Sequence, residues 1–315
     1  MGLRFAISSA LLLLATCLWP GKCHAQDLAP RAYLITPNHS NAITLTYAFL
    51  DGGIEFEGNL PITGATARVH LSTLSYYHSF RLFGRSANFV AFLPYSVTDF
   101  HGTVAEAETF GHRSGLLAPV FRVSVNLIGG PAMDQKAFME WRQKTLLGVS
   151  FRFVPSAGQY DPTKLINLGT NRWAFRPELG YSRRWGHWIV DAYGGAWFFT
   201  KNPEFFSHNA FSPGANTQTE SPVGSFEGHL SYDVRPRLWL SLDGNFWFGG
   251  TTNLNGVRNP ATLQRNSRLG ATGSVPLTAH QSLKLSYSNG AYIRYGGNYQ
   301  SVSLGWQYSW LGRPN

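Results

Sequence analysis

Apolar and polar residues alternate one by one along most of this chain, which is the pattern of β-strands. The last such run, residues 299–310, places Val302, Leu304, Trp306, Tyr308 and Trp310 at every second position with small polar residues between them. Because side chains on a strand point to opposite faces in turn, one face of this run is apolar and the other is polar. A soluble sheet packed on its own core can share this pattern, but aromatic crowding near a chain end is typical of a transmembrane barrel.

Eleven earlier runs repeat the alternation, so the sequence predicts about twelve strands. They cover residues 41–50, 66–80, 88–97, 121–127, 147–153, 172–182, 188–200, 226–234, 238–248, 268–275 and 283–293. In the second run, Val69 and Leu71 are assigned to the apolar face, with Arg68 and His70 on the polar face. Pro177 fits its run poorly because proline donates no ladder hydrogen bond. Residues 134–141 have helical spacing and predict a short surface helix.

The links between these runs are short and long in rotation. Those after the second, sixth, eighth and tenth runs are short, and the link after the fourth holds the helical piece. The other links are longer and polar, and Asp51-Gly52-Gly53 ends the first run. A chain that weaves through a membrane with short periplasmic turns and longer outer loops has this arrangement. We therefore expect an all-β fold, an antiparallel up-and-down β-barrel of about 12 strands in a bacterial outer membrane, with both termini on the periplasmic side.

The N-terminus has the features of an export signal. Arg4 precedes an apolar run over residues 10–19, which is too short for a spanning helix, and Cys23-His24-Ala25 follows it. We predict a signal peptide over residues 1–25, a periplasmic segment over 26–40, a barrel over 41–310 and a tail over 311–315. Two alternatives stay open: acylation of Cys17, and residues 26–40 acting as a small plug in the barrel mouth.

Composition agrees with an exported membrane protein. Charged residues make up only 14% of the 315 residues, against about 25% in ordinary soluble proteins. Both cysteines lie in the predicted signal peptide, so the mature chain has no thiol for a disulfide, a metal or catalysis. Removing Arg4 and Lys22 with the peptide leaves 24 of the 26 basic residues against 17 acidic ones, and this excess is dispersed rather than gathered into a nucleic-acid patch.

Charged residues on the polar faces predict a charged lumen. We expect the following residues to line a pore, where their opposed charges would orient solutes: Arg68, His70, Arg122, Arg152, Arg172, Arg176, Glu178, Asp191, Glu227, Asp243 and Arg268. These charges can instead pair across strands and fill the interior, since barrels of about 12 strands lie between filled and open ones.

Catalysis and metal binding find little support. His70 and Ser72 share a face of the second run, as a hydrolase would need, but nothing marks either as activated. There is no H-E-x-x-H motif, and His70 and His78 are too far apart to share a metal. We therefore expect a protein that is not an enzyme, with no catalytic residue, no metal site and no cofactor.

Several stretches resemble one family of bacterial outer-membrane proteins, grouped under the meta-pathway of phenol degradation. The most specific is the block from Gly158-Gln159-Tyr160-Asp161-Pro162 to Pro177-Glu178-Leu179-Gly180, and others are Phe83-Gly84-Arg85-Ser86, Trp197-Phe198-Phe199 and Asn266-Ser267-Arg268. The resemblance extends over nearly the whole mature chain. It implies an outer-membrane barrel that passes small aromatic or hydrophobic compounds, and it transfers no residue-level site.

We therefore predict an outer-membrane channel or transporter for small solutes, working by passive passage through a charged lumen. Its partners would be the lipid bilayer, lipopolysaccharide, the outer-membrane assembly machinery and a small-molecule solute, with no nucleic acid. The alternatives are a structural or receptor-like barrel with a filled lumen and an outer-membrane hydrolase.

Overall fold

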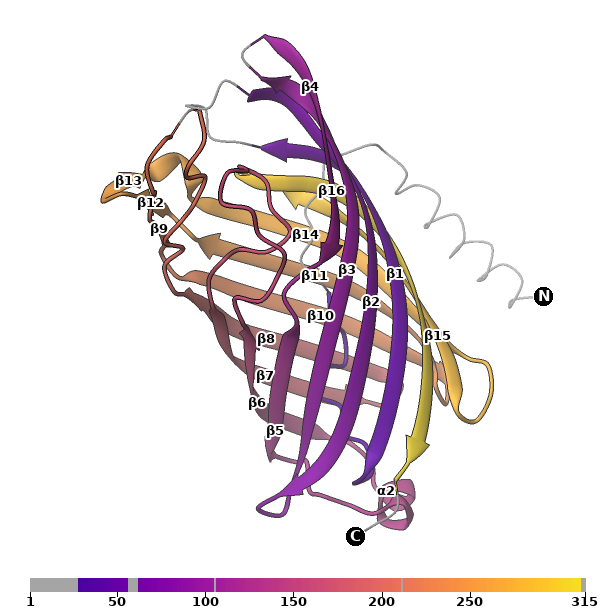
Figure 1. The fold of residues 1–315 in the computed structure, drawn as a ribbon. Helices are drawn as coiled ribbons and strands as arrows, with labels where there is room; N and C mark the ends of the chain where they lie inside the picture. Colours follow the sequence, from indigo (N-terminus) through magenta and orange to yellow (C-terminus); the bar gives the residue numbers. More distant parts are fainter. Residues whose placement is uncertain (1–27, 56–61, 105, 211, 313–315) are drawn as a thin grey trace, which may run out of the picture.

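The computed structural model describes residues 28–55, 62–104, 106–210 and 212–312, most of which form β-strands (Figure 1). The predicted signal peptide and the last three residues of the predicted tail lie outside the described residues. The wall strands are β1 (Ser40–Glu55), β2 (Ile62–Leu82), β3 (Arg85–Val104), β5 (Val120–Ile128), β6 (Thr145–Val154), β7 (Ala174–Trp185), β8 (Trp188–Phe199), β10 (Val223–Arg235), β11 (Leu238–Gly249), β14 (Gln264–Pro276), β15 (Gln281–Tyr292) and β16 (Gly296–Leu311).

Among the described residues, four further strands and two short helices lie outside this ring. They are β4 (Ala107–Leu116), β9 (Gln218–Glu220), β12 (Thr252–Leu254), β13 (Val257–Asn259), α2 (Gln135–Glu140) and η1 (Pro260–Thr262). The predicted helix at 134–141 is confirmed as α2, which Asp134 caps by accepting a hydrogen bond from the backbone N–H of Ala137. Neither described helix is long and apolar enough to cross a membrane.

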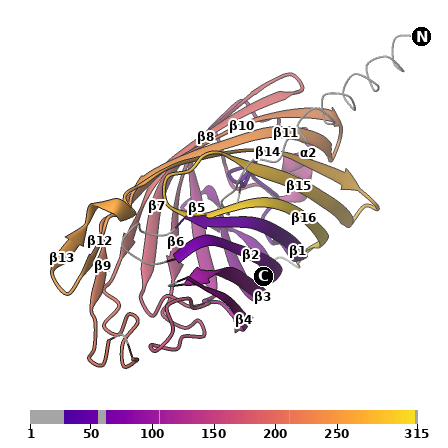
Figure 2. The same ribbon diagram turned by 90° about the horizontal axis from the view of Figure 1, so that it is seen from above.

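The large sheet closes on itself. Its order is β2-β1-β16-β15-β14-β11-β10-β8-β7-β6-β5-β3-β4, and β3 also pairs with β2. Because β4 pairs only with β3, twelve strands remain in the ring, and every neighbouring pair is antiparallel. Figure 2 shows β1 to β3 on one side of the ring and β8, β10, β11 and β14 on the other. The predicted 12-stranded antiparallel barrel is confirmed.

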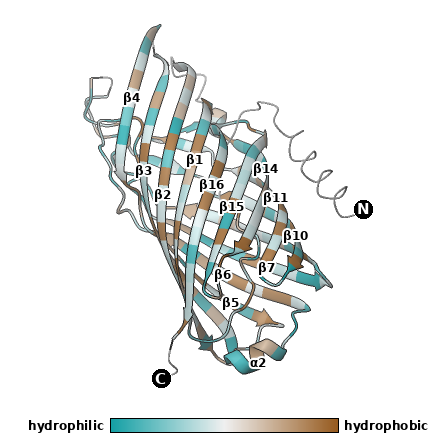
Figure 3. Cartoon of the chain, turned by 90° about the vertical axis from the view of Figure 1, so that its right-hand side faces the viewer, coloured by the Kyte–Doolittle hydropathy of each residue, from teal (hydrophilic) through white to brown (hydrophobic). Residues whose placement is uncertain are grey.

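The outer face of the barrel carries large apolar side chains. Leu45, Leu74, Leu242, Leu269 and Leu304 are each about half or more exposed, and Figure 3 shows hydrophobic positions interspersed with hydrophilic ones along the strands. Exposed apolar surface on this scale is unfavourable in water. A closed barrel pairs all of its backbone groups internally, which is what the hydrocarbon core of a bilayer requires. The chain is therefore a transmembrane barrel of the bacterial outer-membrane type.

The two ends of the barrel differ. At the turn end, residues 83–84, 186–187, 236–237 and 277–280 make short connections, and Ser40 of β1 pairs with Leu311 of β16. At the loop end, the connections 155–173, 200–222 and 250–263 are longer and include β9, β12 and β13. The usual arrangement of outer-membrane barrels places the turn end in the periplasm.

Three expectations about the strands are wrong in detail. Residues 98–118, expected as a polar link, instead form a hairpin because β3 continues to Val104 and returns as β4. Asp51-Gly52-Gly53 does not end the first strand, which runs to Glu55. Gly52 pairs with Tyr299 of β16, and only glycine fits there because an added Cβ would lie 2.0 Å from the carbonyl oxygen of Asn298. Arg172 precedes β7 and belongs to a loop.

Pro177 is accommodated within β7 by a gap in the ladder. The β7–β8 register passes from Phe175 opposite Phe198 to Glu178 opposite Gly195, and it skips residues 176 and 177. The missing N–H of proline therefore costs no hydrogen bond on that side.

Candidate functional site

The inner face of the barrel is polar and charged. Eight of the residues predicted for the lumen occupy inward strand positions, and all of these except half-buried Arg152 are buried: Arg122, Arg152, Arg176, Glu178, Asp191, Glu227, Asp243 and Arg268. Arg172 lies in the loop before β7, where it forms an ion pair with Glu220 of β9. The alternation of each strand fixes these positions, because its apolar residues must face lipid.

Two residues predicted for the lumen, Arg68 and His70, instead lie on the outer face. Leu74 of β2 lies opposite Leu45 of β1, and both are about half exposed, at 49% and 53%. Directly opposite residues share a face. Arg68, six positions before Leu74, is therefore also outward and forms an ion pair with Asp51. Because Leu74 must face lipid, the strict alternation along β2 places Arg68 and His70 on the same outward face.

The segment before β1 crosses the lumen. We call residues 28–36 the strap. Its Tyr33 is only 1% exposed, and the phenol hydroxyl lies 3.0 Å from Ser150 Oγ and 2.9 Å from Glu178 Oε1 on the inner wall. The strap therefore lies against the inner wall, and the assignment of residues 26–40 to a periplasmic segment or to a small plug stays a prediction.

Two glycines form a recess for the Tyr33 ring. Gly148 of β6 and Gly180 of β7 lie directly opposite each other, facing inward. A Cβ added at Gly148 would lie 2.5 Å from Tyr33 Cδ1, and one at Gly180 would lie 2.0 Å from Tyr33 Cε2. Only glycine leaves room for the ring at these two positions, so the wall is shaped to hold the strap.

Side chains of the wall satisfy the strap backbone. The N–H of Ala32 donates to the Tyr193 hydroxyl at 3.0 Å, and the carbonyl of Ala32 accepts from Arg122 Nη1 at 3.4 Å. The Tyr33 carbonyl accepts from Asn126 Nδ2 at 3.4 Å. Backbone groups that leave water need such partners. The strap is therefore held by polar contacts with the wall in place of strand pairing.

An ionic contact fixes the strap near the turn end. Arg31 donates from Nη1 to Asp233 at 2.7 Å, and its guanidinium carbon lies 4.4 Å from the centroid of the Trp239 ring. Its backbone N–H donates to Asp191 at 3.1 Å. Asp233 also pairs with Arg184. Arg31 thus links the strap to three wall strands, β8, β10 and β11.

Arg176 is the centre of the buried charges in the wall. It lies 2.7 Å from Glu178 and 2.8 Å from Glu227, and all three side chains are about 5% exposed. Arg122 approaches Glu178 at 3.7 Å. Burying charges is costly unless they are paired in this way.

A second polar group lies on the neighbouring strands. His229 Nδ1 is 2.8 Å from Asp243 Oδ1, and Asp243 also accepts from the hydroxyls of Ser241 and Thr272. His229 Nε2 lies 3.8 Å from Glu227, which joins this group to the Arg176 cluster.

Aromatic and basic side chains meet toward the loop end. The Arg172 guanidinium carbon lies 4.2 Å from the centroid of the Phe199 ring, beside its ion pair with Glu220. Burial raises the pKa of the Glu220 carboxyl, and the nearby Arg172 charge opposes this shift. Trp247 donates from Nε1 to Gln264 at 2.9 Å.

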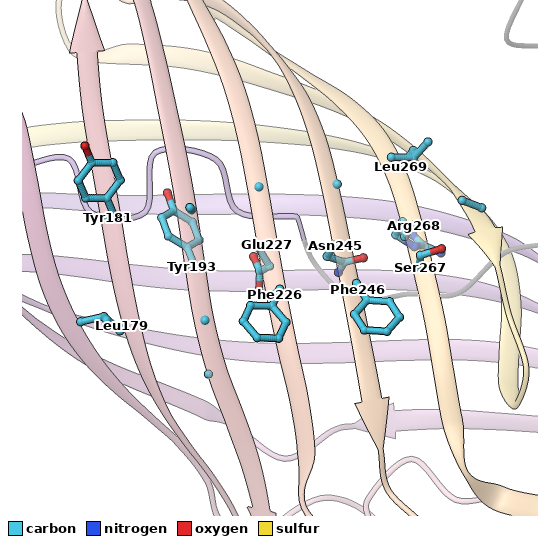
Figure 4. Close-up of a pocket in the computed structure, with 16 residues that line it drawn as sticks. Leu179, Tyr181, Tyr193, Phe226, Glu227, Asn245, Phe246, Ser267, Arg268 and Leu269 are labelled. Carbon is cyan, nitrogen blue, oxygen red and sulfur yellow. The ribbon is translucent and has the colours of Figure 1, made fainter.

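A groove of about 820 Å³ lies on the opposite, lipid-facing side of the wall. Phe226 of β10 and Phe246 of β11 border it on neighbouring strands (Figure 4). Gly194, Gly228 and Gly244 also line it, and their lack of side chains leaves space between the larger residues. Its lining also includes Glu227 and Arg268 of the inner face, so the groove backs directly onto the charged wall of the lumen.

The serine and histidine weighed for hydrolysis lie outside the barrel. His70 Nδ1 contacts the Tyr47 hydroxyl at 2.7 Å, and Tyr47 lies opposite Ser72 on the outward face. Within the part of the chain that the structure describes, no group of three or more His, Cys, Asp or Glu side chains could hold a metal ion.

Sequence reasoning did not identify the residues that hold the strap. Tyr33 and Arg31 lie in a segment without strand periodicity, so no pattern indicated a buried role. Gly148 and Gly180 stood on polar faces, where glycine among larger residues was a usable signal for close approach of another segment.

We expect Gly180→Ala to dislodge the strap. The new methyl group would overlap the Tyr33 ring, and the wall backbone cannot retreat without breaking its ladder. The strap residue Ile35 is buried, and an Ile35→Cys substitution reports its release by faster reaction with a maleimide. Gly228→Ala is the matched control, because a Cβ there meets no atom within 4 Å. Equal labelling rates in the two alanine variants would contradict the recess.

Comparison with known proteins identifies one family and several solved structures with a similar barrel fold. A family model described as "Putative MetA-pathway of phenol degradation" matches residues 63–294. The COG4313 outer membrane channel from Pseudomonas putida F1 is 16% identical, with 90% of this chain and 100% of that chain covered and a TM-score of 0.74. No curated protein matches the chain.

Two autotransporter barrels are also similar. The β domain of the Bordetella autotransporter BrkA is 13% identical, with 87% of this chain and 100% of that chain covered and a TM-score of 0.50. The translocator domain of NalP from Neisseria meningitidis is 12% identical, with 87% and 89% covered and a TM-score of 0.51. At these identities the likeness shows a shared barrel fold.

Proposed function

The chain belongs to the MetA-pathway family of phenol degradation, and from this membership we propose that it is a channel of the bacterial outer membrane. Small solutes, aromatic or hydrophobic compounds among them, would pass passively through its charged lumen. The strap would control this passage. The signal peptide over residues 1–25, and contact with lipopolysaccharide and the assembly machinery, belong to the same proposal.

One observation carries the proposal: a segment that is not part of the wall lies across the lumen. The strap is joined to the wall by side-chain hydrogen bonds and one ionic group, and it takes no part in the strand ladder. Such a segment can leave while every wall strand keeps its backbone partners. A purely structural barrel has no need of a removable filler, since wall side chains can fill a barrel of this size.

The charged interior supports passage of polar groups. Arg122, Arg176, Glu178, Glu227 and Asp243 face inward from neighbouring strands, so opposite charges lie close together across the wall. Charges arranged in this way orient dipolar and ionic solutes. The name of the similar Pseudomonas putida protein describes it as an outer membrane channel, which agrees with this proposal.

Two other functions are weighed against it. A receptor or structural barrel would keep the strap permanently in place. A hydrolase would need an activated serine near a base, whereas Ser72 and His70 lie on the outer face and His70 is engaged by Tyr47.

Liposome swelling separates these functions. We expect vesicles that contain the protein to swell in isotonic solutions of small sugars and of aromatic acids faster than empty vesicles, with rates that fall as the sugar grows. No swelling above the empty vesicles would favour the filled barrel, and release of fatty acids from the vesicle lipid would favour the hydrolase.

A further inference from the structure

Three arginines lie side by side on the inner wall. Arg122 of β5 is directly opposite Arg152 of β6, and Arg152 is directly opposite Arg176 of β7. Directly opposite side chains on neighbouring strands start about 5 Å apart. Like charges in that position repel each other, so such a row requires compensating anions.

The carboxylates of the wall compensate only two of the three. Glu178 and Glu227 pair with Arg176, and Glu178 also approaches Arg122. Three guanidinium groups thus face two carboxylates, which leaves one positive charge in excess. Among the described residues, Arg152 has no ion pair or hydrogen bond with an acidic side chain, and it is half-buried rather than enclosed.

An aromatic surface lies beside Arg152. The Trp197 and Phe199 rings on the inward side of β8 are stacked, with centroids 6.5 Å apart and planes 9° apart. The Arg152 guanidinium carbon lies 6.0 Å from the centroid of the Trp197 ring. Both rings are half-buried, so water reaches them as it reaches Arg152.

This arrangement lies next to the strap, on its loop-end side. Tyr33 of the strap bonds to Ser150, and Arg152 is the next inward residue of β6 toward the loop end. A solute that enters from the loop end therefore reaches Arg152 and Trp197 before it reaches the strap.

We propose that Arg152, Trp197 and Phe199 form a binding site for small aromatic carboxylates in the lumen. The planar guanidinium fork pairs with a carboxylate through two hydrogen bonds, and the solute ring packs on the indole in an offset stack. A neutral aromatic compound gains only the stacking and an aliphatic acid only the charge pairing. The inference rests on the proposed channel function and names its substrate class.

The test uses benzoate, acetate and benzyl alcohol on single channels of the full chain in planar bilayers. With the wild type, we expect benzoate to reduce the chloride current at concentrations where acetate and benzyl alcohol have little effect. Arg152→Gln should raise the half-blocking concentration of benzoate about tenfold or more, since a charged hydrogen-bond pair is lost. Arg152→Lys, which keeps the charge but not the fork, should give a smaller increase.

Arg68→Gln is the matched control. It removes the same charge from an exposed, outward position, so benzoate should block it as it blocks the wild type. Trp197→Leu should weaken block by benzoate and leave the response to acetate unchanged. An unchanged half-blocking concentration in Arg152→Gln, or equal block by acetate and benzoate, would overturn the site. The channel itself would still stand if chloride current persists in every variant, and it falls only if the wild type carries none.

Discussion

Deletion of the strap, residues 28–36, should raise the single-channel conductance several-fold. The strap crosses the whole lumen, from Leu28 beside Gly270 of β14 to Thr36, whose hydroxyl lies 2.8 Å from that of Tyr77 on β2. Its removal deletes no wall strand and leaves the polar inner face exposed to water. The segment that follows stays anchored, because the Pro37 carbonyl accepts from Ser79 Oγ at 2.6 Å.

The measurement is conductance in planar bilayers at one salt concentration, with heat-modifiable migration on gels as the check that the barrel has folded. Tyr33→Phe is the control, since it keeps the ring in its recess and removes only the hydroxyl. It should leave the conductance close to that of the wild type. A deletion variant that folds but conducts like the wild type would place the limiting constriction elsewhere, in the folded segments of the loop end.

The wall of the barrel was predictable because a single physical demand governs it. A strand with lipid on one side and polar groups on the other must alternate, and residues 121–127 and 147–153 show this over their full length. The prediction failed in β2 because its two halves differ. Leu74 and Tyr76 face lipid. Arg68 and His70 lie on the same outward face nearer the loop end, but because they are polar the sequence predicted that they face the lumen.

The strap could not be predicted because its role depends on contacts that periodicity does not encode. Tyr33 is buried where Gly148 of β6 lies beside Gly180 and Glu178 of β7. Only the register between β6 and β7 brings these three residues together. Alternation alone predicted that Arg176 faces inward. It could not predict the ion pair with Glu227, because that pair joins β7 and β10 across the intervening strand β8.

Arg176→Met should cost the barrel about 3–5 kcal/mol of unfolding free energy, the usual effect of removing one partner from a buried ion pair. Arg176 is the sole cation within 3 Å of both Glu178 and Glu227, as far as the described residues show. Methionine fills much of the same volume, so the loss would come from two carboxylates that lose their nearest counter-charge in a site that is about 5% exposed. Reversible urea unfolding in lipid vesicles measures the change.

Two further variants separate charge from packing in this effect. Arg183→Met, on the same strand but on the exposed face over Trp185, should cost about 1 kcal/mol or less. Combining Arg176→Met with Glu227→Gln removes one stranded charge while Glu178 keeps Arg122 at 3.7 Å, and it should recover part of the lost stability because the amide still accepts hydrogen bonds. Equal losses in Arg176→Met and Arg183→Met would mean that water already reaches the carboxylates, and the Arg176 cluster would then be part of a hydrated passage even with the strap in place.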